Sequence, residues 1–167
     1  MYKSILVAIV IIMYSCQQKE QKANTLTDSE RSAIIDSIKA VIVNINKAAE
    51  EVDADRLISY LSKSDNIRFV NQDAKVMYPY DSIHAAWKKG YSGLIKQVIQ
   101  PSEPFINVLT PDYAIVTNAT DFTATVKDST KVGGPVAWTL LFTRESGQWK
   151  ILNGQQAIKW REPSPKK

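Results

Sequence analysis

The sequence has few of the side chains that enzymes commonly use for metal binding and covalent catalysis. Of its 167 residues, one is cysteine and one is histidine. A single cysteine removes any disulfide framework, so packing alone must hold the folded part together. A single histidine excludes a two-histidine dyad or a histidine-rich metal site within one chain. Glycine-rich phosphate loops, nucleophile elbows and cysteine/histidine clusters are also missing, so we expect neither a metal nor a cofactor.

No charge of one sign is concentrated in the chain either. The formal net charge is +4, but Lys and Arg are scattered, apart from a short tail at 163–167 that is typical of a solvated end. We therefore expect no binding to nucleic acid. What remains is ordinary for a globular protein, because 44% hydrophobic and 23% charged residues indicate one domain with a real core, preceded by an N-terminal extension.

The first 15 residues differ from the rest of the chain. Lys3 precedes an unbroken apolar run over 5–13, which is shorter than the roughly 20 apolar residues that span a bilayer. This pattern predicts a secretion signal, and its end, Met13-Tyr14-Ser15-Cys16, resembles a bacterial lipobox. The resemblance implies that Cys16 carries a lipid as the first residue of the mature chain. An uncleaved signal anchor with an incidental cysteine is the alternative.

These features divide the chain into four segments. We predict a lipoprotein signal peptide at 1–15, a flexible tether at 16–26, a folded domain at 27–161 and a disordered tail at 162–167. We therefore expect a protein of the bacterial cell envelope, anchored to the membrane by its lipid and facing the periplasm or the outer-membrane surface.

The first half of the domain has helical periodicity. Thr27 and Glu30 form a capping box ahead of a broad apolar stripe, which predicts a long one-sided helix. Asp53 is placed to cap a second, shorter helix. A small hairpin over 67–78 follows, and a third helix begins at Asp81. One face of this third helix is predicted to carry Ile83, Trp87 and Tyr91.

The second half of the domain is predicted to be all strand. The strands are expected at 94–100, 105–109, 113–126, 136–144 and 149–160. Prolines and glycines separate them, among them Gly133-Gly134-Pro135 before the fourth strand. Helices first and an antiparallel sheet afterwards predict an α+β fold with the helices on one face of the sheet.

The last two strands are predicted to form a hairpin that turns at Glu145-Ser146-Gly147-Gln148. Each arm could run to about ten residues, where an ordinary strand has about five or six, so we expect the arms to bend and to form the wall of a cavity. Alternation places Trp138 and Phe142 on one face of the first arm. The residues predicted to share a face of the second arm are Trp149, Ile151, Asn153 and Gln155.

The order of helix, helix, small hairpin, helix and strongly bent antiparallel sheet resembles the nuclear transport factor 2-like superfamily, in particular its SnoaL-like and ketosteroid-isomerase-like members. The most specific local match is GQWKILNGQQA at 147–157, where members commonly carry a Gly-x-Trp-Lys-Ile core followed by histidines and a serine. The resemblance covers about Thr27 to Trp160 and implies a cone-shaped domain with a central pocket.

This sequence departs from those members after the Trp-Lys-Ile core. Asn153 and Gln155 replace the common histidines, and Ala157 stands where a serine often lies. Amides form hydrogen bonds but do not titrate, so neither Asn153 nor Gln155 can act as a general acid or base. The resemblance therefore implies that the polar end of the pocket survives as a binding feature only.

Relatives with isomerase or dehydratase chemistry use an Asp or His base, together with a Tyr or an acid that stabilises a developing oxyanion. Two residues are candidates for the base here. His84 lies beside the apolar face of the third helix, and Asp121 lies, by strict alternation, opposite to the strand face that carries Asn118 and Phe122. The phenol could come from any of three residues, between which the sequence does not choose: Tyr60, Tyr80 and Tyr113.

An apolar wall with a few amides suits a small, mostly hydrophobic ligand. The predicted ligand-binding residues are Trp87, Asn118, Phe122, Trp138, Phe142, Asn153 and Gln155. For the aromatic residues among them, a place in the core is the alternative. The favoured function is an exported, lipid-anchored domain that binds a small molecule without turning it over. One alternative is an isomerase, dehydratase or cyclase that uses His84 or Asp121 as its base.

A third hypothesis, from a different class, is an interaction module that forms a homodimer through the exposed face of its sheet. The residues predicted to face outward on the last strand are apolar enough to permit this contact. They are Lys150, Leu152, Gln156, Ile158 and Trp160.

The lipid anchor is tested by the substitution Cys16→Ala. Without the thiol no lipid can be attached, so we expect the variant to lose lipid labelling and to accumulate as a soluble or unprocessed precursor. Metabolic labelling with a fatty acid and membrane fractionation measure both effects. A variant that still fractionates with membranes as a cleaved product would contradict the lipoprotein assignment.

Overall fold

The computed structural model describes residues 26–161. The predicted signal peptide and the predicted tail lie outside the described residues, as does the predicted tether, Cys16 included, except for its last residue. The helices are α2 (Asp28–Glu50), α3 (Ala54–Ile58) and α4 (Tyr80–Tyr91). The strands are β1 (Arg68–Val70), β2 (Val76–Met77), β3 (Leu94–Ile99), β4 (Phe105–Thr110), β5 (Tyr113–Val126), β6 (Lys131–Glu145) and β7 (Gln148–Ile158). Within residues 26–161, none of the helices has the length and hydrophobicity needed to cross a bilayer.

The helix starts follow from their capping residues. The Thr27 hydroxyl accepts a hydrogen bond from the Glu30 amide, and the Glu30 carboxylate accepts one from the Thr27 amide at 2.8 Å, which completes the predicted capping box. Asp53 Oδ1 accepts from the Arg56 amide at 3.0 Å and starts α3, also as predicted. The apolar stripe of α2 is buried along one side of the helix.

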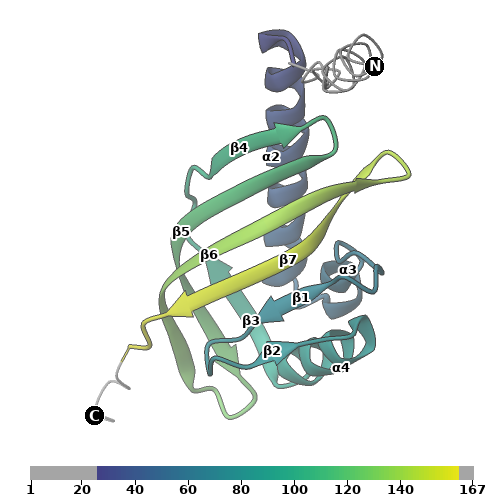
Figure 1. Ribbon diagram of the computed structural model, residues 1–167. Coiled ribbons are helices and arrows are strands. Elements are labelled where there is room, and N and C mark those ends of the chain that lie inside the picture. The colour runs from purple at the N-terminus through teal and green to yellow at the C-terminus, as the bar shows by residue number, and fades with distance from the viewer. Residues whose placement is uncertain (1–25, 162–167) are drawn as a thin grey trace, which may run out of the picture.

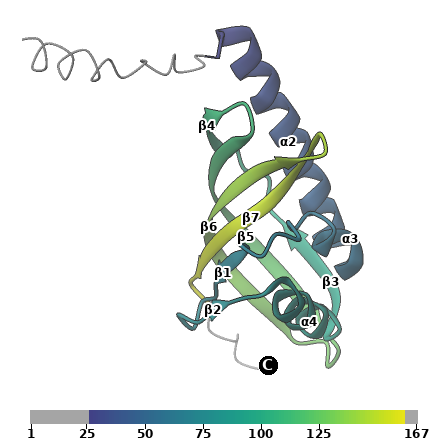
Figure 2. The same ribbon diagram turned by 45° about the vertical axis from the view of Figure 1, so that its right-hand side comes forward.

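The strands form one strongly curved sheet, in the order β2-β1-β7-β6-β5-β3, with β4 also paired to β5. The long strand β5 has two partners on one edge, because β4 pairs with its first half and β3 with its second half. All pairs are antiparallel except β1 with β7, which are parallel. Figures 1 and 2 show α2 running along one face of this sheet, with α3 and α4 near one end. The predicted α+β class and bent sheet are confirmed.

The start of β6 differs from the prediction. Gly133-Gly134-Pro135 lies inside the strand, and the turn falls earlier, where Ser129 has a positive φ and the Thr130 amide donates to Asp128 Oδ1 at 2.8 Å. Gly133 is needed for close approach to β5, because a Cβ on this residue would lie 2.2 Å from the Phe122 carbonyl oxygen. Here glycine extends a strand where it was expected to end one.

The face assignment in β7 is wrong beyond Ile151. Phe142 pairs with Ile151 but Leu141 pairs with Asn153, so Leu152 is an extra residue in the strand. One extra residue reverses which side chains face inward. Asn153 is therefore exposed, whereas the next residue, Gly154, is buried so tightly that a Cβ there would lie 2.4 Å from the Phe69 ring.

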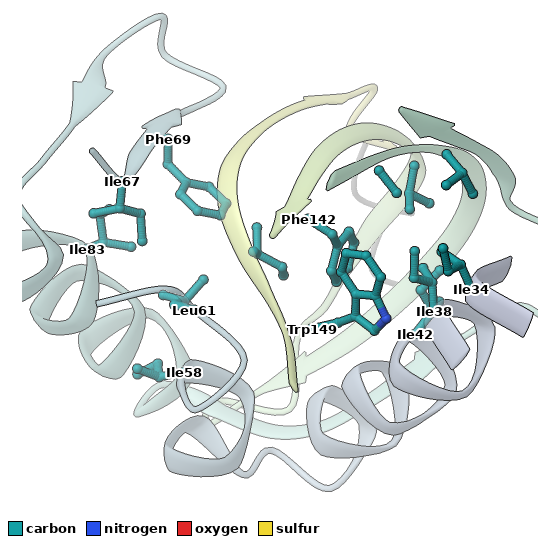
Figure 3. Close-up of a cluster of buried hydrophobic side chains, with 14 residues drawn as sticks. Ile34, Ile38, Ile42, Ile58, Leu61, Ile67, Phe69, Ile83, Phe142 and Trp149 are labelled. Atoms are coloured by element: carbon teal, nitrogen blue, oxygen red, sulfur yellow. The ribbon is translucent and has the colours of Figure 1, made fainter. Parts of the chain in front are cut away.

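The hydrophobic core lies between the sheet and α2. Figure 3 shows Trp149 and Phe142 facing Ile38 and Ile42 of the helix. Trp149 is 3% exposed and Phe142 is fully buried. The Arg144 guanidinium lies 5.0 Å from the centre of the Trp149 ring and adds a cation–π contact at the edge of this core.

Trp149→Ala should lower the free energy of unfolding by roughly 3–5 kcal/mol, the usual cost of emptying a buried aromatic site. The matched control is Phe105→Ala, since Phe105 is 81% exposed and its removal should change stability by about 0.5 kcal/mol or less. Urea denaturation measures both variants. Equal, small losses would show that Trp149 does not pack in the core.

Candidate functional site

A pocket of about 470 Å³ lies between the curved sheet, α2 and α4. Its volume is within the range of sites that hold small organic ligands. Most of its lining is apolar, and aromatic rings form a large part of the wall: Phe69, Trp87, Phe122, Trp138 and Trp160. Two ring pairs meet edge to face, Phe69 with Trp87 at 5.3 Å between centroids and Phe122 with Trp160 at 5.9 Å.

Amide and phenol side chains enter this wall in two places. Where α2, α4 and β3 meet, the lining includes Asn46, Tyr91 and Gln97. The second group belongs to the β1–β2 turn and to β7, which are neighbours because β1 pairs with β7. This group consists of Asn71, Gln72, Gln155 and Gln156. Gln72, Gln155 and Gln156 are exposed, so the second group lies at the rim.

Among the lining residues that the structure describes, Tyr91 is the single ionisable side chain. Burial raises the pKa of its phenol to about 12. At neutral pH the phenol is therefore protonated and can donate a hydrogen bond to a ligand. No carboxylate, imidazole, ammonium or guanidinium group is part of the lining, within the part of the chain that the structure describes. The pocket can thus hold hydrogen-bonding groups but has no base of ordinary pKa.

The predicted ligand-binding residues are only partly brought together. Trp87, Phe122, Trp138 and Gln155 line the pocket. The other three residues lie elsewhere: Phe142 in the core, Asn118 under a loop and Asn153 on the outer face. Asn118 is 3% exposed, and its amide exchanges hydrogen bonds of 2.8 and 3.0 Å with the Ser102 hydroxyl, which explains why a buried amide is tolerated there.

Neither candidate base lies in the pocket. His84 is half-buried on α4 and is not part of the lining, and its ring is tilted against Tyr80 at 5.9 Å between centroids. Asp121 faces away from the pocket and forms an ion pair with Arg161. None of the three tyrosines proposed from the sequence is part of the lining. Within residues 26–161 no group of three or more acidic, histidine or cysteine side chains could hold a metal ion.

Several pocket residues were missed in the sequence, among them Tyr91, Asn46 and Gln156. Tyr91 was placed correctly on the Trp87 face of the third helix, but its phenol was not considered for the site. Asn46 stands next to Ile45 and four residues after Ile42, so the helical period alone could have placed it at the edge of the apolar stripe. Gln156 carries no such signal, because its inward direction depends on the bulge at Leu152.

A family model described as a SnoaL-like domain matches residues 38–158. Comparison with the curated proteins finds no match.

Solved structures with similar folds share little sequence with this chain. A candidate dehydratase of the NTF2-like family from Streptomyces avermitilis has a TM-score of 0.68 and 15% identity, covering 77% of this chain and 98% of that one. A candidate scytalone dehydratase from Novosphingobium aromaticivorans DSM 12444 has a TM-score of 0.73 and 8% identity, covering 84% and 94%. The type 3 hexachlorocyclohexane dehydrochlorinase LinA from Novosphingobium barchaimii LL02 has a TM-score of 0.67 and 10% identity, covering 83% and 95%. At such identities these likenesses show the fold alone.

Tyr91→Phe tests the burial of the phenol. Because burial raises the pKa of Tyr91 from 10 to about 12, the folded state holds this proton more tightly than the unfolded chain does. The resulting stability is complete below pH 10 and is lost as the pH rises from 10 to about 12. We expect the free energy of unfolding to fall more steeply over this range in the wild type than in Tyr91→Phe, as measured by urea denaturation. Tyr113→Phe, at an exposed position, should follow the wild type, and three parallel curves would contradict the assignment.

Proposed function

Because this chain belongs to the SnoaL-like domain family, we propose that its conical pocket binds a small, uncharged and mostly hydrophobic molecule without turning it over. The proposal includes the setting expected from the first 16 residues, an exported domain that a lipid on Cys16 tethers to the bacterial cell envelope. A pocket of 470 Å³ lined mainly by aromatic and aliphatic groups supports a flat organic ligand.

The observation that carries this proposal is that the described part of the lining holds no acid or base of ordinary pKa. Proton abstraction near neutral pH needs a group whose pKa lies close to the working pH. Among the described lining residues only Tyr91 is ionisable, and burial raises its pKa to about 12, while both His84 and Asp121 lie outside the pocket. The side chains that remain can orient a ligand through hydrogen bonds, which is what a binding protein requires.

The same lining argues for an uncharged ligand. A carboxylate or ammonium group that enters an apolar pocket loses its hydration, and it is tolerated only when a partner of opposite charge compensates. The described lining offers amides, one hydroxyl and one phenol, but no ionised partner at neutral pH. Amides can satisfy a carbonyl, hydroxyl or amide group of the ligand without such a cost.

An enzyme of the isomerase, dehydratase or cyclase type is the second candidate. It is supported by the names of the structural neighbours, two of which are described as candidate dehydratases and one as a dehydrochlorinase. In this chain the Tyr91 phenol could donate a hydrogen bond to a developing oxyanion. The base, however, would have to come from outside the lining residues.

The homodimer stays a proposal, and its surface needs correction. Of the residues named for it from the sequence, Gln156, Ile158 and Trp160 line the pocket. The outer face of the sheet instead carries small, uncharged side chains in cross-strand rows, such as Ala119, Ala137 and Ala157. A surface with these properties suits contact with another protein better than the residues first named.

The binding hypothesis predicts that Gln156 matters and Asn153 does not. Both are amides on β7, but Gln156 lines the pocket and Asn153 faces outward. For an uncharged aromatic amide found by thermal-shift screening, Gln156→Ala should weaken binding by roughly 1–3 kcal/mol if it leaves a polar group of the ligand unpaired. Asn153→Ala and His84→Gln should bind like the wild type in calorimetric titrations.

The recovered ligand distinguishes binding from turnover. After prolonged incubation, mass spectrometry should return the compound unchanged if the pocket only binds it. Conversion of the compound that stops in Tyr91→Phe would support the enzyme instead, and loss of conversion in His84→Gln would contradict the placement of that residue outside the chemistry.

A further inference from the structure

A short segment after β7, residues 159–161, continues along the first residues of β6. We call this segment the C-terminal strap. The Lys159 amide donates to the Pro135 carbonyl at 3.0 Å, and the Arg161 amide donates to the Gly133 carbonyl at 2.9 Å. The strap thus extends the contact of β7 with β6 beyond the last strand residue, Ile158.

The close approach of the strap depends on Gly134. Its φ is +153°, and a Cβ at this position would lie 2.1 Å from the Lys159 carbonyl oxygen and 3.3 Å from the Arg161 nitrogen. Both atoms belong to the backbone and cannot move aside as a flexible side chain could. A larger residue at 134 would therefore push the strap away from β6.

The strap holds β5 from both of its faces. On the inner face, the Trp160 ring packs edge to face against Phe122, and both residues line the pocket. On the outer face, the Arg161 guanidinium forms an ion pair with Asp121 and donates to the Thr123 hydroxyl at 3.1 Å. Asp121, Phe122 and Thr123 are consecutive in β5. Trp160 and Arg161, which are neighbours in the strap, therefore contact the same short segment of β5 from opposite faces.

We propose that the strap makes Trp160 the residue that decides which ligands the pocket retains, and that the Asp121–Arg161 pair positions it. This inference rests on the proposed binding function and deepens it. Trp160 is 49% exposed although it lines the pocket, so a large part of its ring is uncovered. A flat, uncharged ligand beside Phe122 covers that apolar surface and gains from its burial. Asp121 then acts as a positioning residue and not as a base.

The four tryptophans allow a direct test by ¹⁹F NMR of the full-length chain labelled with 5-fluorotryptophan. Trp87, Trp138 and Trp160 line the pocket, whereas Trp149 lies in the core and serves as an internal reference. Replacing each tryptophan by phenylalanine assigns the signals. Asp121→Asn, Arg161→Gln and Gly134→Ala should each shift the Trp160 signal and leave the Trp149 signal in place.

Lys159→Gln is the matched control for these strap variants. It changes a charge in the same segment, but within the described residues the Lys159 side chain has no hydrogen bond or ion pair. Its spectrum should match that of the wild type. A Trp160 signal that is unchanged in both Arg161→Gln and Gly134→Ala would overturn the positioning role of the strap, whatever the pocket binds.

The retention role is tested with 2-naphthamide, a flat uncharged aromatic amide, and with 2-naphthoate as its charged counterpart. The amide should bind at least tenfold more tightly than the carboxylate. Trp160→Ala should weaken amide binding about tenfold or more, Trp160→Phe should restore part of it, and Arg161→Gln should weaken it by up to about fivefold, since an exposed ion pair contributes little.

Failure of the proposed ligand binding and failure of the proposed role of Trp160 can be told apart. If the wild type binds neither compound, the proposed binding of flat uncharged ligands fails, while the NMR comparison still decides whether the strap positions Trp160. If the wild type binds the amide and folded Trp160→Ala binds it equally well, the pocket function stands and the role of Trp160 is refuted. Thermal unfolding of each variant shows whether it is folded.

Discussion

One extra residue in β7 determines what the pocket contains. Without the bulge at Leu152, Asn153 and Gln155 would point inward, and the pocket would carry its amides at the positions where relatives resembling this chain often have histidines. With the bulge, Gly154, Gln156 and Ile158 follow Ile151 on the inner face, Asn153 is exposed, and Gln155 lines the pocket only at its rim. The chemistry available to a ligand therefore depends on backbone register as much as on residue type.

Local rules predicted the fold well, because its elements carry strong local signals. The capping box at Thr27, the cap at Asp53 and the turn at Ser146-Gly147 all act within a few residues, and each lies where the sequence indicates. Contacts within the sheet, in contrast, join residues that are far apart in the sequence. Whether Gly133-Gly134-Pro135 ends a strand or continues it depends on β5 and on the strap, which are distant in sequence.

The candidate site could be predicted only in part, because local periodicity is visible in the sequence and contacts between distant segments are not. Trp87, Phe122 and Trp138 follow the periods of their own elements, so their inward direction could be read from the sequence. Asn118 also faces inward, but Ser102 covers it, and no pattern within β5 indicates that partner. His84 was a candidate base because it is the one histidine of the sequence, and Asp121 because it interrupts the apolar strand around Phe122. Each is instead engaged at the surface, with Tyr80 and Arg161 respectively.

Within the described residues, Tyr91 is the only ionisable group of the lining, and burial raises its pKa to about 12. This has a consequence for how binding responds to pH. A binding site built on histidine or carboxylate groups would gain or lose charge as the pH of the medium changes. In this pocket the lining keeps the same protonation from acidic to mildly alkaline conditions, so occupancy would follow the ligand's concentration and ignore the acidity around it.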